Sequence, residues 1–438
     1  MQRTGNNPLY ELRGRVSPLK ALPFSLQHIL AMFVTNLLPI GIVTAAASPA
    51  LSQNEILVLV QNAMVAAGIA TFIQSTPIRR LGSGLPIFMG VSFTFIVPLS
   101  AVAAGYGYNA VIGTVLAGGV FEGILGLTAR YWRKIIAPVV SAVVVTGIGL
   151  SLLSTATRFF GGGNVQDFGS SANLVIGFVT LLVCILWQIF MKGTKKQLAI
   201  LAGLVAGYIT ALLFGKVDLS NLTENGWFAL PKLLPYSPVF RVDAILSICI
   251  IYLVSATETM GDASALAGGA LHREITAEEI SGALTADGFG SVLGGLLGVT
   301  PVTSYSENVG LTIMTGVINR NVARVGALLM ILCGFFPPIG QFVRTIPSPV
   351  IGGVMLMVLG QILVTGFQMI AEAGFTPRNK LIVSLSMTMG IGFTASTEAG
   401  IWNEFPLIVQ SIFAQNVVSV IFVIAMLLNL LLPKRMEE

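Results

Sequence analysis

Glu258 and Glu307 are carboxylate residues placed in otherwise mostly apolar stretches of the chain, residues 251–266 and 300–316. A charged side chain at the middle of a bilayer costs roughly 2.5–3.5 kcal/mol on insertion scales, so such residues usually serve a substrate or ion path. Asp262 follows Glu258 by four positions, which places both carboxyl groups on one face of a continuous helix. Two neighbouring carboxyl groups suit the transfer of a proton. A polar contact between helices is the alternative role for each of them.

The composition is that of a membrane protein. Charged residues make up 10% of the 438 residues, hydrophobic residues make up 54%, and the mean hydropathy is +0.86. A soluble domain carries about 25% charge, so the chain is expected to cross a bilayer many times. The pI near 9.2 reflects loop charge rather than nucleic-acid binding, since the sequence has no basic–aromatic stretch and no phosphate-binding glycine loop. It also has no metal-ligand cluster, nucleophile–base pairing or cofactor motif, so we expect neither an enzyme nor a bound cofactor.

Apolar windows of about 20 residues predict an all-α polytopic protein with fourteen transmembrane segments. The first seven are residues 24–44, 54–75, 84–103, 109–129, 135–155, 172–191 and 197–215. The second seven are residues 242–266, 279–298, 300–317, 322–342, 348–370, 380–397 and 404–432. Four are weak as ordinary helices: 84–103 and 300–317 are rich in Gly, Pro, Ser and Thr, 279–298 contains Asp287, and 404–432 is overlong and expected to break near Asn416.

The distribution of Lys and Arg tests this count of spans. If both termini are cytoplasmic, all but five of the 24 Lys and Arg residues fall on the cytoplasmic side. The five exceptions are Arg158, Lys216, Lys232, Arg241 and Arg344. This bias predicts a multi-pass protein of the plasma (inner) membrane with both termini in the cytoplasm.

The chain divides into two halves at its longest polar connection, residues 216–241, which is expected to be extracytoplasmic. Residues 1–215 and 242–438 then hold seven spans each, and an odd number makes the two halves inverted repeats. The third span of each half is irregular, with Pro86 ahead of Ser92 in one and Pro301 ahead of Ser304 in the other. Discontinuous segments at matching positions indicate a transporter site near the midplane.

Residues 306–316, SENVGLTIMTG, resemble the signature of the nucleobase–ascorbate transporter family. That signature is Gln or Glu, then Asn-x-Gly, four residues, and Thr followed by Arg, Lys or Gly. Other elements of the family match in order along the chain: LQH at 26–28, GVSFTF at 90–95, TETMGD at 257–262 and ADG at 286–288. The resemblance covers essentially the whole chain.

The resemblance implies two inverted repeats with short strands and half-helices in spans three and ten. It also implies a core domain of spans 1–4 and 8–11 and a gate domain of spans 5–7 and 12–14. Substrate would lie between the strands and half-helices of spans three and ten. Members are typically homodimers that move the core like an elevator.

The residue types suit a nucleobase, which is a flat heterocycle edged with N–H donors and C=O acceptors. A carboxylate such as Glu258 or Glu307 accepts two N–H groups at once, and aromatic rings such as Phe93 and Tyr305 stack on flat faces. Tyr305 and Glu307 project the same way if their segment is extended. A half-helix beginning after Asn308 would point its N–H groups at the ligand.

Other residues of the candidate substrate site are Ser306 and Gly310, the latter allowing close backbone approach. Phe93 and Tyr305 could instead be core aromatics, and Asn308 could bond backbone. Proton coupling is expected at Glu258 and Asp262, with His28 either a third member or a satisfied structural histidine. The roles of Glu122 and Asp287 stay open.

The motifs give conflicting indications of which nucleobase is the substrate. Asp262, four residues after Glu258, resembles purine carriers, whereas Glu307 at the start of the signature resembles uracil permeases. We favour import of a purine such as xanthine, urate or guanine with protons. A uracil:proton symporter is the alternative, and an anion exchanger of related architecture fits poorly because Glu258 and Glu307 would repel an anion.

Overall fold

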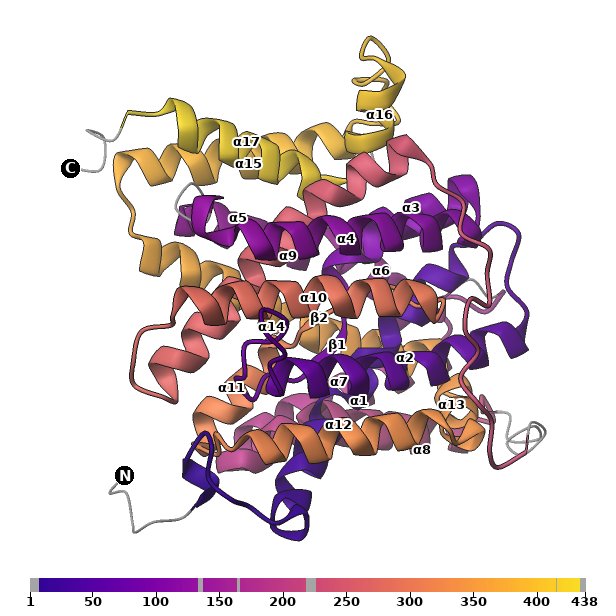
Figure 1. Ribbon diagram of the computed structural model, residues 1–438. Helices are drawn as coiled ribbons and strands as arrows, with labels where there is room; N and C mark the ends of the chain where they lie inside the picture. Colours follow the sequence, from indigo (N-terminus) through magenta and orange to yellow (C-terminus); the bar gives the residue numbers. More distant parts are fainter. Residues whose placement is uncertain (1–7, 133–136, 164–165, 218–225, 415, 434–438) are drawn as a thin grey trace.

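The computed structural model describes residues 8–132, 137–163, 166–217, 226–414 and 416–433, which form a mostly helical bundle. Most of the long helices run alongside one another (Figure 1). The helices of the first half are α1 (Pro18–Ala45), α2 (Gln53–Ser75), α3 (Ile96–Tyr106), α4 (Tyr108–Trp132), α5 (Pro138–Ser151), α6 (Leu153–Phe160), α7 (Ser171–Phe190) and α8 (Ala199–Leu213). The helices of the second half are α9 (Val242–Gly269), α10 (Ala277–Leu296), α11 (Ser306–Thr315), α12 (Arg320–Gly334), α13 (Pro337–Arg344), α14 (Ser348–Ala373), α15 (Pro377–Ala395), α16 (Leu407–Phe413) and α17 (Val417–Leu431).

Within these ranges, seven helical segments are long and apolar enough to cross a membrane: α1, α2, α4, α5 with α6, α7, α9 and α14. The number becomes eight if α12 and α13 count as one bent span. Each of the fourteen expected spans overlaps a described helix, and several of those helices are shorter than a full crossing. The structure therefore confirms a polytopic helical membrane protein, while the count of fourteen stays a prediction.

Two expected spans are broken. Residues 322–342 were expected to form one span, but α12 and α13 meet at 85°. The reason is local: Phe336 is extended, with φ −106° and ψ 97°, and Pro337 and Pro338 follow it. Proline lacks the N–H that would continue the helix ladder. The expected break in residues 404–432 lies where it was predicted, because α16 ends at Phe413 and Asn416 caps the start of α17.

A pair of short strands lies in the middle of the bundle, β1 (Met89–Val91) and β2 (Val302–Ser304). They are antiparallel, with Met89 opposite Ser304 and Val91 opposite Val302, and both are fully buried. A 3-10 turn (η2, Phe93–Phe95) and α3 follow β1, and α11 follows β2. The two segments singled out as irregular are therefore each a strand followed by a short helix.

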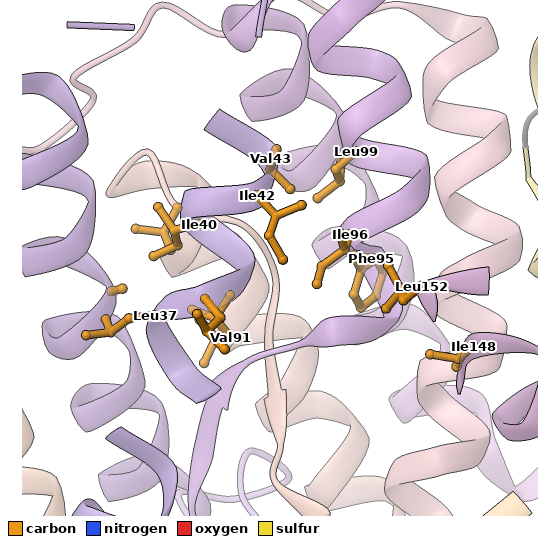
Figure 2. Close-up of a cluster of buried hydrophobic side chains, with 14 of the residues drawn as sticks. Leu37, Ile40, Ile42, Val43, Val91, Phe95, Ile96, Leu99, Ile148 and Leu152 are labelled. Carbon is orange, nitrogen blue, oxygen red and sulfur yellow. The ribbon is translucent and has the colours of Figure 1, made fainter. Parts of the chain in front are cut away.

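Apolar side chains fix the first of these segments against its neighbours. Figure 2 shows Ile42 and Val43 of α1 next to Ile96 and Leu99 of α3, above the end of β1. All four belong to one buried cluster, which includes Val91 of the strand. An apolar core of this kind holds the strand and its following turn in a defined place, which a binding site requires.

Corresponding helices of the two halves of the chain have corresponding packing partners. In the first half α4 packs against α10 and α9, and in the second half α12 packs against α2 and α1. The strands follow the same rule, since β1 rests on α2 and β2 on α10. Most of the remaining helices pack chiefly among themselves, with α5 on α14, α7 on α8, and α15 on α17, whereas α13 contacts α2 and α16 contacts α9.

Candidate functional site

The two strands bring the N-terminal ends of two short helices to the centre of the protein. Since β1 and β2 are antiparallel and three residues long, η2 with α3 and α11 leave the pair from its opposite ends. Gly90 makes this junction possible. A Cβ on Gly90 would lie 2.7 Å from Asn36 Oδ1 and 2.8 Å from Tyr305 Cε2, so a larger residue would separate β1 from α1 and from Tyr305.

Glu258 of α9 lies against the turn that follows β1. The Thr94 hydroxyl donates a hydrogen bond to Glu258 Oε2 at 2.9 Å. Thr94 is held in turn by its own N–H, which donates to the Ser92 hydroxyl at 3.3 Å. Glu258, from the second half of the chain, is thus bonded to the strand–helix junction of the first half. Its other oxygen, Oε1, has no hydrogen bond to the described residues.

Asp262 lies one turn further along α9, which is continuous from Val242 to Gly269, so Glu258 and Asp262 share a face as the sequence predicted. Asp262 Oδ2 accepts hydrogen bonds from the hydroxyls of Ser304 and Ser306, each at 3.0 Å. Ser306 is the first residue of α11, and its described hydroxyl contact is with Asp262. The expected contact of Ser306 with the substrate stays a prediction.

Glu307 lies in the first turn of α11, and Tyr305 is the extended residue just before that helix, with φ −113° and ψ 100°. The segment is not extended throughout, because the backbone becomes helical at Ser306, yet the side chains of Tyr305 and Glu307 both lie near Thr35 of α1. The half-helix also begins at Ser306 rather than after Asn308. Glu307 therefore sits where the helix dipole favours a negative charge, and Thr35 of α1 interacts with its carboxylate.

Asn308 and His28 form a contact between α11 and α1. The Asn308 amide donates to the His28 carbonyl at 3.4 Å and meets the Met32 sulfur at 3.1 Å, so Asn308 bonds backbone. The His28 ring stacks on Phe88 with centroids 4.3 Å apart and planes 11° apart. His28 is 3% exposed, and its ring packs on Phe88. Among the described hydrogen bonds, none joins the His28 side chain to Glu258 or Asp262.

The two aromatic candidates differ. Tyr305 is 6% exposed, and its hydroxyl has no hydrogen-bond partner among the described residues. Phe93 is half-buried and packs on the edge of the main apolar cluster. Gly310 is exposed, and a Cβ there would meet nothing within 4 Å, so no part of the described chain approaches it closely.

Sequence reasoning missed three residues that position the site. Thr94 bonds Glu258, Ser304 bonds Asp262, and Asn36 Oδ1 accepts the Val91 N–H at 2.7 Å. Asn36 could have been recognised from the sequence, since a buried amide within an apolar span must find a partner. Thr94 and Ser304 were harder to recognise, because hydroxyl residues are common in membrane helices.

A cavity of about 1,030 Å³ lies beside the same helices, between the end of α3, the start of α9 and the segment around α16. Pro98 and Val102 of α3 and Ser247 of α9 line it, while Glu258 does not. The cavity therefore adjoins α9, which carries Glu258, and α3, which follows the turn that carries Thr94. The C-terminal end of α3 and α16 lie at the end of the bundle opposite the first and last described residues (Figure 1).

The sequence matches known transporters over most of its length. A family model described as the permease family, that of the xanthine and uracil permeases, matches residues 19–399. The chain is 33% identical over 453 residues to the xanthine permease XanQ of Escherichia coli, covering 99% of this chain and 95% of that one. It is 30% identical over 411 residues to the uric acid permease PucJ of Bacillus subtilis, covering 91% of this chain and 90% of that one.

A solved structure shares the fold. The murine anion transporter Slc26a9 in its inward-facing state superposes with a TM-score of 0.63 at 10% identity, over 94% of this chain and 68% of that one. At that identity the likeness concerns the fold alone, whereas the sequence matches are to permeases, which are transporters and not enzymes. The chain therefore belongs to the xanthine/uracil permease family, the nucleobase–ascorbate transporters.

Proposed function

We propose that this protein imports a nucleobase, specifically a purine such as xanthine or urate, together with a proton. One observation carries the proposal: Glu258 and Asp262 of α9 lie at the β1–β2 junction, held by Thr94, Ser304 and Ser306. Carboxylates placed in this way can accept N–H groups from the edge of a base. The relatives named as xanthine and uric acid permeases support a purine rather than uracil.

Binding rests on complementary edges and faces. Glu258 accepts N–H groups of the base, and a hydrogen bond to a charged group is worth roughly 1.5–3 kcal/mol. Glu307, at the positive end of α11, accepts from a second edge. Phe93 and Tyr305 flank the ring, and the unpaired Tyr305 hydroxyl is available to a ligand C=O group. Asp262 carries the coupling proton next to Glu258.

The architecture that suits this function is fourteen spans in two inverted repeats. The helix contacts support this repeat. The contact of α4 with α10 corresponds to that of α12 with α2, and the contact of α4 with α9 corresponds to that of α12 with α1. In this scheme α1–α4 and α9–α13 form a core that carries the site. α5–α8 and α14–α17 form a gate against which the core moves as an elevator. The chain acts as a homodimer.

We propose that both termini lie in the cytoplasm and that the protein resides in the inner membrane. Two features support this. The first and last described residues lie at one end of the bundle, and the connection described from residue 226 to 241 runs along the other end (Figure 1). The Lys and Arg residues also concentrate on the terminal side, as the positive-inside rule requires.

Uptake by the purified full chain in proteoliposomes tests the proposal. Radiolabelled xanthine, urate, guanine and uracil are compared with and without an inward pH gradient, and a protonophore is added as a control. Accumulation of a purine that needs the gradient and stops with the protonophore is expected. Gradient-driven uptake of uracil alone would favour the alternative that Glu307 suggests, a uracil:proton symporter. Chloride-dependent exchange of an inorganic anion would favour an anion exchanger.

A further inference from the structure

Two buried carboxyl groups lie outside the substrate site, Glu122 of α4 and Asp287 of α10, each 0% exposed. The two helices approach closely because Gly288 packs against the backbone of Gly123. A Cβ on Gly288 would lie 2.3 Å from the Gly123 nitrogen, so no side chain separates the backbones at that level. Glu122 and Asp287 directly precede these glycines, and their carboxyl groups interact electrostatically across the interface.

Neither carboxyl group is neutralised by the chain. Both oxygens of Glu122 and Oδ1 of Asp287 have no hydrogen-bond partner among the described residues, and Ser291 in the same interface also has an unpaired hydroxyl. No described ion pair involves Glu122 or Asp287. Two bare anions in an apolar interior are strongly unfavourable, so the pair needs bound cations or bound protons.

A chain of hydroxyl groups connects this pair to the substrate site. The Thr259 hydroxyl donates to Asp287 Oδ2. Thr259 Oγ1 and Ser304 Oγ lie 2.9 Å apart, and Ser304 Oγ lies 3.0 Å from Asp262 Oδ2. In the structure each hydroxyl donates to an aspartate, which leaves no hydrogen between Thr259 and Ser304. The row has three contacts and two hydroxyl hydrogens, so a proton on Asp262 or Asp287 would turn one hydroxyl toward the other and make all three contacts hydrogen bonds. The row can therefore hold one additional proton.

We infer that Glu122 and Asp287 form a buried proton store, connected to Asp262 through Ser304 and Thr259, and that the coupling proton moves along this path. Asp262 gives its proton to Ser304, Ser304 gives its own to Thr259, and Thr259 gives its own to Asp287. Each hydroxyl keeps one hydrogen and reverses its orientation, so one proton moves and no other bond changes. The inference rests on the proposed proton symport and assigns its path.

Within the described residues, the titratable groups that interact with the two ends of the path come chiefly from α9. The ionisable residues that interact with Asp287 or Glu122 are Tyr252, Glu258 and Asp262, all on α9. α2 and β2 also pack on α10, and their one ionisable residue is Glu55, in the first turn of α2. A proton leaving Asp262 through Ser304 therefore has Asp287 as its acceptor.

The variant Thr259→Val tests the path, because it keeps the shape and deletes the hydroxyl. Two transport measurements are made in proteoliposomes with radiolabelled xanthine and urate: accumulation driven by a pH gradient, and exchange at equal pH on both sides. In the variant we expect gradient-driven accumulation to fall roughly tenfold or more while exchange remains measurable, and Thr259→Ser should restore accumulation. Thr257→Val is the matched control, since the Thr257 hydroxyl bonds the Val254 carbonyl at 2.7 Å and is not in the path.

The path is overturned if the wild type responds to the gradient and Thr259→Val accumulates substrate to the same level. If the wild type ignores the gradient, the proposed symport fails first, and infrared difference spectroscopy then decides the proton store. Protonated buried carboxyl groups give a carbonyl stretching band, which we expect in the wild type at neutral pH and expect to be weakened in Glu122→Gln and in Asp287→Asn. Absence of this band, or its replacement by a sodium-dependent carboxylate signal, would show that the pair holds a metal cation instead.

Discussion

Thr94 and Glu258, 164 residues apart in sequence, are joined by a hydrogen bond of 2.9 Å. The bond connects the turn after β1 to α9, and it orients one oxygen of the carboxylate. Thr94→Val should lower the efficiency of purine uptake roughly tenfold, the value of one hydrogen bond to a charged group. Thr94→Ser should keep most of it. Initial uptake rates at several substrate concentrations measure the effect, and equal rates in Thr94→Val and wild type would show that Glu258 is oriented by other groups.

Glu258→Gln should abolish saturable uptake at normal membrane abundance. The side chain has no Lys or Arg within ten sequence positions on either side, so its charge is available to a ligand. The glutamine amide has the same size as the carboxylate, but it offers an NH₂ donor in place of the second acceptor oxygen. Binding of xanthine and urate to the detergent-solubilised variant, measured by calorimetry, separates loss of binding from loss of movement. Wild-type uptake by Glu258→Gln would remove Glu258 from the site.

Glu307→Gln should change which bases compete rather than stop transport. Glu307 lies in the first turn of α11 beside Thr35, where either a carboxylate or an amide can accept a hydrogen bond. A base that offers only donors at this edge should lose about 1–3 kcal/mol. Competition of xanthine, urate, guanine, hypoxanthine and uracil against a labelled purine measures this, and an unchanged order of potency would argue against contact with the substrate.

The sequence predicted the location of the strand–helix junctions but not their hydrogen bonds. Proline and hydroxyl residues marked both irregular segments, because such residues disfavour a continuous helix. Thr94 could not be foreseen as the partner of Glu258, since a threonine in a membrane span often bonds the carbonyl four residues earlier. Thr44, Thr146 and Thr180 all do so in this protein. Only the tertiary fold distinguishes Thr94 from them.

The start of α11 was misplaced for a related reason. The sequence Ser306-Glu307-Asn308 contains several residues that can begin a helix, and the pattern does not decide among them. The structure begins α11 at Ser306 because Tyr305 is paired by its N–H to the Phe88 carbonyl, extending the strand contact by one residue. A tertiary hydrogen bond therefore decides this boundary, which places Glu307 in the first turn of α11.

The interface between α4 and α10 gives a stability prediction with an internal control. Gly288→Ala places a Cβ 2.3 Å from the Gly123 nitrogen, whereas a Cβ on Gly123 meets nothing within 4 Å. The first change should therefore force the helices apart and reduce folded yield and thermal stability, at a cost of about 1–3 kcal/mol or more. Gly123→Ala should change stability little, because alanine is also favoured in helices. Similar melting temperatures for the two variants in the same detergent would contradict the close packing.

Proton coupling through Asp262 predicts a specific change in pH dependence. Asp262 accepts hydrogen bonds from Ser304 and Ser306 and lies one helical turn from Glu258, so it can hold a proton beside the substrate. In the wild type, uptake should rise as external pH falls, because a higher proton concentration loads the carrier on the outside, and it should collapse with a protonophore. Asp262→Asn carries no titratable proton, so it should flatten the pH dependence while leaving equilibrium binding of xanthine or urate within about tenfold of wild type. Uptake measured between external pH 5.5 and 8, alongside binding in detergent at the same pH values, provides the comparison. If uptake follows a sodium gradient and ignores the protonophore, Glu258 and Asp262 act as cation ligands rather than as proton carriers.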